Sequence, residues 1–86
     1  MKGGFFMTKI TIFTQTGCYP CIVLKHWLQQ EKIDFVEKNI TEDEQALEEF
    51  KELNLEFTPV SYIEHKGVKH QVLGISQKKF SNILSS

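Results

Sequence analysis

The stretch Thr8–Cys21, which reads TKITIFTQTGCYPC, decides the fold of this 86-residue chain. β-branched residues dominate its first half and alternate with polar ones, which predicts a strand over residues 8–14. A short Gln-Thr-Gly segment breaks that pattern, and apolar residues at helical spacing then predict a helix from about position 18 to Glu31. We therefore expect Cys18 and Cys21 where a strand passes into the first turn of a helix.

The rest of the chain continues to alternate between strands and helices. The predicted elements are a strand over 33–40, a helix that ends near Asn54, a strand over 60–64, a turn at 65–67, a strand over 68–73 and a last helix capped by Ser76. In the resulting order, βαβαββα, the first two strands are parallel through a right-handed crossover and the last two form an antiparallel hairpin. The sequence predicts an α/β fold, with a four-stranded mixed sheet flanked by three helices.

The middle helix has its own start signal. Thr41 is expected as the N-cap, and Glu44 three residues later would complete a capping box. The apolar residues that follow recur at helical spacing, and we expect them to be buried: Ala46, Leu47, Phe50 and Leu53.

Composition narrows the classes of partner. With 41% hydrophobic and 24% charged residues, the chain suits a single globular domain. The net charge of −1 gives no reason to expect a nucleic acid or a membrane surface as partner. All ten basic residues are lysines, so side chains offer no bidentate clamp for carboxylate or phosphate, and an anionic ligand must be held by Lys or by backbone N–H groups.

Residues 1–7 are interpreted as an N-terminal extension, and residues 8–86 as the domain. Either Met1 or Met7 can be the natural start, because the predicted first strand follows directly after Met7. The segment is too short for the apolar region of a signal peptide. The closely spaced cysteines therefore suggest redox chemistry in a reducing compartment, the cytoplasm.

A Cys-x-x-Cys pair at the start of a helix has a specific chemical use. Free N–H groups and the positive end of the helix dipole stabilise a thiolate and lower the pKa of a thiol placed there. Cys18, at the exposed turn, is predicted to be the nucleophile, and Cys21, inside the first turn, resolves the mixed disulfide. Pro20 suits the first helical turn, where an N–H has no intrahelical partner. Tyr19 either touches substrate at the rim or is simply exposed.

These residues, together with the later segment Phe57-Thr58-Pro59-Val60, resemble the thioredoxin-fold superfamily, most closely its glutaredoxin branch and the related NrdH-type redoxins. The resemblance covers the chain from Thr8 onward. It implies that Pro59 follows a cis peptide bond and faces the cysteines. It also implies that Thr58 offers backbone hydrogen bonds to an extended substrate, with Val60 and Gly74 beside it.

Departures from the glutaredoxin pattern bear on the electron donor. The order Tyr19-Pro20 is reversed relative to the usual motif, and a single Gly74 followed by Ile75 and Ser76 replaces the Gly-Gly and acidic pair that bind glutathione. This resembles the NrdH-type redoxins, which take electrons from thioredoxin reductase and NADPH and donate them to ribonucleotide reductase. We expect a monomeric reductase of protein disulfides without a bound cofactor. Glutathione as the donor remains an alternative.

Rival classes stay open at this point. A zinc site needs four ligands, and the chain adds only His26, His65 and His70 to one Cys-x-x-Cys. A dimer that shares an iron–sulfur cluster through Cys18 is conceivable in the family. A non-catalytic interaction module, with both cysteines as core residues, is a third possibility.

Overall fold

The structure, a computed structural model, describes residues 8–85. The predicted extension over residues 1–7 and the choice between Met1 and Met7 lie outside the described residues. The elements are β1 (Thr8–Thr14), α2 (Tyr19–Gln30), β2 (Val36–Asn39), α3 (Glu44–Lys51), β3 (Val60–His65), β4 (Val68–Leu73) and α4 (Gln77–Leu84). Their order is the predicted βαβαββα.

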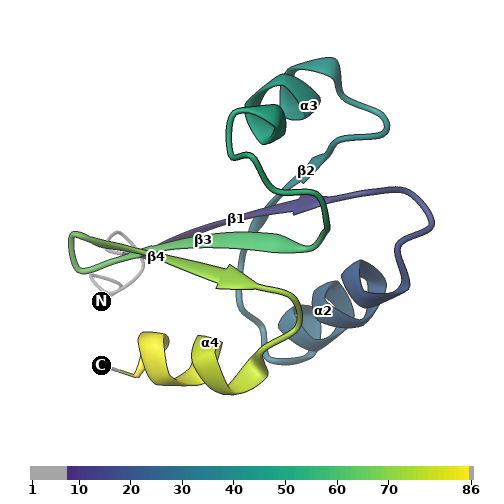
Figure 1. Cartoon of the computed structure of the whole chain (residues 1–86). Coiled ribbons are helices and arrows are strands. Elements are labelled where there is room, and N and C mark those ends of the chain that lie inside the picture. Colours follow the sequence, from purple (N-terminus) through teal and green to yellow (C-terminus); the bar gives the residue numbers. More distant parts are fainter. Residues whose placement is uncertain (1–7, 86) are drawn as a thin grey trace.

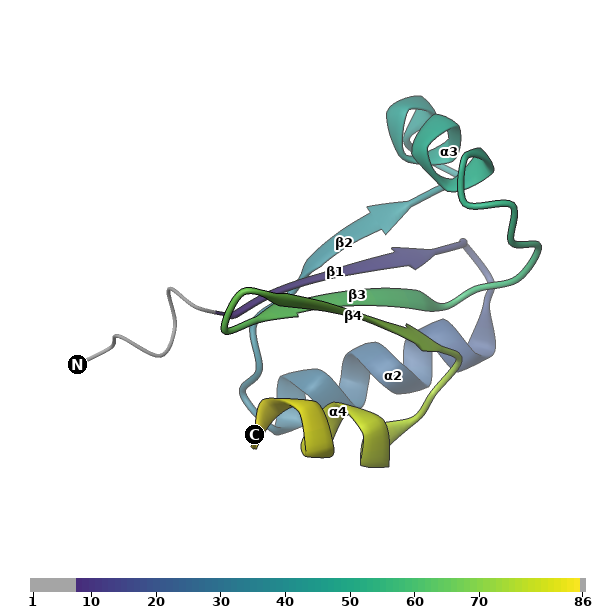
Figure 2. The same cartoon turned by 60° about the vertical axis from the view of Figure 1, so that its left-hand side comes forward.

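One four-stranded sheet, in the order β2-β1-β3-β4, organises the molecule. The pair β1–β2 is parallel, whereas β1–β3 and β3–β4 are antiparallel, so the predicted mixed sheet is confirmed. Helices α2 and α4 cover one face of the sheet and α3 lies on the other (Figures 1 and 2). Because β1 and β3 are antiparallel, the β1–α2 loop lies at the same end of the sheet as the start of β3 (Figure 1).

The larger core lies between the sheet and the helices α2 and α4. Side chains that alternate along the strands meet apolar residues of the two helices there: Ile10, Ile12, Leu24, Leu28, Ile63, Val72 and Phe80. A smaller cluster on the α3 side contains Phe13, Phe50 and Val60. Each such side chain contributes roughly 1.5–3 kcal/mol when fully buried, so both faces of the strand that leads to the cysteines are held in place.

The start of α3 corrects one prediction. The N-cap is Asp43, whose Oδ1 accepts hydrogen bonds from the backbone N–H groups of Gln45 at 2.9 Å and Ala46 at 3.4 Å. The capping box predicted from Thr41 is therefore wrong. The side chain of Asn39 accepts from the N–H groups of Thr41 and Glu42, which holds both residues in a turn before the helix.

Other boundaries differ by a few residues. Helix α3 ends at Lys51 rather than near Asn54, which has a left-handed φ of 58°. Ala46 and Phe50 are buried as expected, but Leu47 and Leu53 are half-buried. Strand β2 is shorter than the predicted 33–40, and β3 is one residue longer than expected. Ser76 does occupy the N-cap position of α4, although its side chain forms no capping hydrogen bond.

Candidate active site

The loop between β1 and α2 places the two cysteines. Gly17 has a φ of 83°, a left-handed conformation that glycine adopts without strain, and this turns the chain into α2. Cys18 is the N-cap of that helix, and its Sγ accepts a hydrogen bond from the backbone N–H of Cys21 at 3.3 Å. Pro20 lies in the first turn, as the sequence predicts.

The cysteines form a disulfide, with their Cα atoms 5.3 Å apart. Their surroundings differ sharply: Cys21 is 1% exposed, in the interior beside the core, whereas Cys18 is only half-buried. Of the two cysteines, Cys18 is therefore the one with surface exposed to solvent.

The segment before β3 lies against the same sulfur. The Thr58–Pro59 peptide bond is cis, as expected from the resemblance, and Pro59 is fully buried. Thr58 Oγ1 donates a hydrogen bond to Cys18 Sγ at 3.4 Å, and its carbonyl oxygen lies 3.7 Å from that sulfur. Gln15 Nε2 in turn donates to Thr58 Oγ1 at 3.1 Å, which leaves the hydroxyl proton of Thr58 directed at the sulfur.

A second set of hydrogen bonds ties the cysteine loop to the loop between β2 and α3. The backbone N–H of Thr16 donates to Thr41 Oγ1 at 3.1 Å. Thr16 Oγ1 donates to Glu42 Oε2 at 3.1 Å and accepts from Asn39 Nδ2 at 3.3 Å. Sequence reasoning missed these contacts of Gln15 and Thr16 and gave Thr41 a different role, because the partners lie 23 to 43 positions apart and no local pattern marks them.

An open groove of about 430 Å³ runs past the disulfide. Three of the predicted substrate-binding residues line it: Tyr19, Pro20 and Thr58. The other three do not line it: Pro59 and Val60 are fully buried, and Gly74 donates its N–H to the carbonyl of Pro59 at 2.9 Å. The remaining lining residues are Gln15, Thr16, Gly17, Cys18, Glu56 and Phe57.

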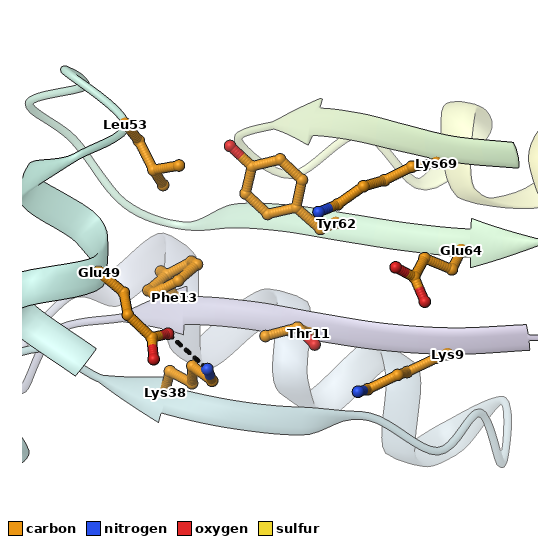
Figure 3. A pocket seen from close by; sticks show the side chains of 9 residues that line it. All are labelled: Lys9, Thr11, Phe13, Lys38, Glu49, Leu53, Tyr62, Glu64 and Lys69. Atoms are coloured by element: carbon orange, nitrogen blue, oxygen red, sulfur yellow. Dashed lines mark hydrogen bonds and ion pairs between the residues drawn. The ribbon is translucent and has the colours of Figure 1, made fainter. Parts of the chain in front are cut away.

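A second groove, of about 300 Å³, lies on the α3 face of the sheet and contains neither cysteine (Figure 3). Two of its lysines have a partner within the groove. Lys38 forms an ion pair with Glu49, and Lys69 Nζ stands 5.2 Å from the centre of the Tyr62 ring. This groove mixes charged and apolar side chains and contains no thiol.

Glu37, on β2, forms an ion pair with Lys25 of α2. Partial burial raises the pKa of its carboxyl, but hydrogen bonds from Lys25 at 2.8 Å and Thr14 at 2.6 Å, with the charge of Lys25, outweigh burial and hold the pKa below its ordinary value. The carboxylate thus fastens β1, β2 and α2 together while leaving Lys25 neutralised.

Within residues 8–85, no three His, Cys, Asp or Glu side chains come together in a way that would hold a metal ion. The same part of the chain contains no helix with the length and apolar character that a membrane span requires.

Comparisons with known proteins agree with this geometry. The glutaredoxin family model matches residues 10–68. Glutaredoxin-like protein NrdH of Lactococcus lactis subsp. cremoris is 31% identical over 51 residues, which are 59% of this chain and 71% of that protein. Global transcriptional regulator Spx 2 of Bacillus cereus is 32% identical over 44 residues, 51% of this chain, but the chain spans only 34% of the regulator's length.

The fold has solved counterparts. The crystal structure of the thioredoxin-like protein BC3987 superimposes with a TM-score of 0.71 at 24% identity, covering 87% of this chain and 99% of that one. The family model covers more than half of the chain and includes the cysteine pair and the Thr58–Pro59 segment. The chain therefore belongs to the glutaredoxin family, a family of thiol–disulfide oxidoreductases with the thioredoxin fold.

Proposed function

We propose that this protein reduces disulfide bonds in other proteins, with Cys18 as the nucleophile and Cys21 as the resolving thiol. One observation carries the proposal: a half-buried Cys18 at a helix N-cap is joined to a buried Cys21 at the edge of an open groove. A pair of incidental core cysteines would bury both sulfurs, and only Cys21 has that environment.

The reaction consists of two thiol–disulfide exchanges. In the reduced protein, the thiolate of Cys18 attacks one sulfur of the substrate disulfide. A Cys18–substrate disulfide forms, and the other substrate sulfur leaves as a thiolate that takes up a proton. The Cys21 thiol then loses its proton and attacks Cys18, which releases the second substrate thiolate. Two electrons have passed to the substrate, and the protein is left with the Cys18–Cys21 disulfide.

Several residues support each step. The N–H of Cys21 and the hydroxyl of Thr58 both donate to Cys18 Sγ, so negative charge that develops on this sulfur meets two donors already in place. The main-chain groups of Thr58 make no backbone hydrogen bond with the rest of residues 8–85, which leaves them available to an extended substrate segment. Tyr19 and Pro20 also line the groove.

We propose a flavoprotein of the thioredoxin reductase type, with NADPH, as the electron donor, and a reductase of the ribonucleotide reductase kind as a substrate in the cytoplasm. The resemblance to NrdH supports this donor. The groove supports it too, because no lysine lines it and the chain has no arginine, so side chains offer no cation for the two carboxylates of glutathione. We propose that the protein acts as a monomer and binds no cofactor.

A comparison of two reducing systems tests the proposal. The oxidised protein is mixed with insulin and either thioredoxin reductase with NADPH or glutathione with glutathione reductase and NADPH, and NADPH consumption is followed. We expect faster turnover with thioredoxin reductase and none with Cys18→Ser. Rapid turnover with glutathione alone would overturn the donor, and no insulin reduction in either system would overturn the function.

A further inference from the structure

The groove beside the disulfide is lined by a single charged side chain, which is negative. Among the residues that line it, Glu56 alone has a charged side chain at neutral pH. Glu56 is exposed and takes part in none of the ion pairs found over residues 8–85. Glu42, whose Oε2 accepts a hydrogen bond from the groove residue Thr16, adds a second carboxylate nearby. Both charges are therefore available to an incoming chain.

No lysine lines this groove, and four of the lysines have contacts or positions elsewhere. Lys25 forms an ion pair with Glu37. Lys9, Lys38 and Lys69 all line the second groove on the α3 face (Figure 3). The lining of the groove beside Cys18 thus contains one carboxylate and no lysine, although the chain as a whole has a net charge of only −1.

The same groove exposes two aromatic side chains. Tyr19 is 73% exposed at the start of α2, and Phe57 is 47% exposed next to Glu56. Both line the groove; in the chain, Tyr19 lies between the two cysteines and Phe57 directly precedes Thr58. Exposed aromatic side chains around a reactive group are typical of surfaces that bind an apolar residue of a partner.

We infer that Glu56 determines substrate specificity. The preferred substrates are protein disulfides in which the attacked cysteine has a lysine or arginine on one side and an apolar residue on the other. The inference rests on the proposed function and names its substrate class. The cationic residue pairs with Glu56, and the apolar residue packs on Tyr19 or Phe57. An acidic segment meets repulsion from the same carboxylates.

Two synthetic peptides test this inference. Each contains one disulfide with a phenylalanine beside the attacked cysteine. One carries lysine on the other side of that cysteine and its partner carries glutamate. With wild-type protein at low salt, kcat/KM is expected to be about two- to fivefold higher for the lysine peptide, the range expected for one exposed ion pair. The ratio should approach one in about 1 M salt, where such a pair is screened.

Variants identify the carboxylate. Glu56→Gln should bring the ratio close to one, and Glu56→Lys should favour the glutamate peptide. Glu52→Gln is the matched control, because it removes the same charge from an exposed residue at the end of α3 that does not line the groove, and it should leave the ratio unchanged. Equal rates for both peptides with wild-type protein, or an equal loss of preference in both glutamine variants, would overturn the inference. Failure to reduce either peptide would instead overturn the proposed function.

Discussion

Replacing Thr58 by valine isolates the contribution of one hydroxyl group to the reactivity of Cys18. Valine has nearly the same shape and is also β-branched, so the segment before Pro59 keeps its packing and its backbone preference. The substitution removes the hydrogen bond that Thr58 Oγ1 donates to Cys18 Sγ at 3.4 Å. It also removes the acceptor for Gln15 Nε2, which lies at the surface and can turn to water.

The size of the effect follows from that contact. A hydrogen bond to a charged group contributes about 1.5–3 kcal/mol, and the long contact to a half-buried sulfur argues for the lower end. A loss of about 1.4 kcal/mol from the thiolate alone lowers the thiolate fraction roughly tenfold at a pH where the thiol form dominates. We therefore expect the rate of Cys18 alkylation by iodoacetamide to fall several-fold to tenfold under those conditions.

The assay is alkylation of the reduced protein, with mass spectrometry to identify the modified cysteine. Thr58→Ser keeps the hydroxyl and should retain most of the wild-type rate, which separates the hydrogen bond from packing. Gln15→Ala should slow alkylation to a smaller extent, because the Gln15 side chain orients the hydroxyl of Thr58. In the Thr58→Val background the same substitution should have no effect. Equal alkylation rates in wild type and Thr58→Val, with both proteins folded, would refute the reasoning.

Two further predictions concern stability. Glu37 has a pKa held below its ordinary value of 4.5 in the folded protein, so its contribution is present above that value and is lost as the pH falls through the lowered pKa. Glu37→Gln should therefore cost about 0.5–1 kcal/mol at pH 7 in urea unfolding and nothing at strongly acidic pH; a constant difference across this range would contradict the assignment. Gly17→Ala forces a left-handed φ of 83° on a residue with a Cβ, although nothing within 4 Å would clash with it. The expected cost is about 1–2 kcal/mol, seen as a drop of several degrees in Tm, and an unchanged Tm would show that the loop relaxes.

The elements that could be predicted from the sequence are those set by local patterns of apolar residues. Strand β1 and helix α2 follow from an alternating apolar pattern and a helical one, separated by a glycine, and together these place Cys18 and Cys21. Both patterns depend on neighbours within one turn or one strand. The cis bond before Pro59 was expected from the resemblance rather than from any local rule.

The features that could not be predicted depend on contacts between residues far apart in the sequence or on tertiary context. Two residues able to cap α3, Thr41 and Asp43, lie two positions apart, and the choice between them depends on how the Asn39 side chain holds the preceding turn. The link from Gln15 to Thr58 joins segments 43 positions apart. Strand β2 begins only at Val36 because its pairing with β1 starts there, so residues 33–35 have no partner in the ladder.

The central claim, that Cys18 attacks and Cys21 resolves, is tested most directly by trapping the intermediate. Reduced Cys21→Ser is mixed with a protein disulfide and examined by intact mass under non-reducing conditions. We predict one covalently bound substrate per chain, linked through Cys18, and none with Cys18→Ser. A stable adduct on Cys18→Ser, formed through Cys21 with a yield like that of Cys21→Ser, would contradict the claim.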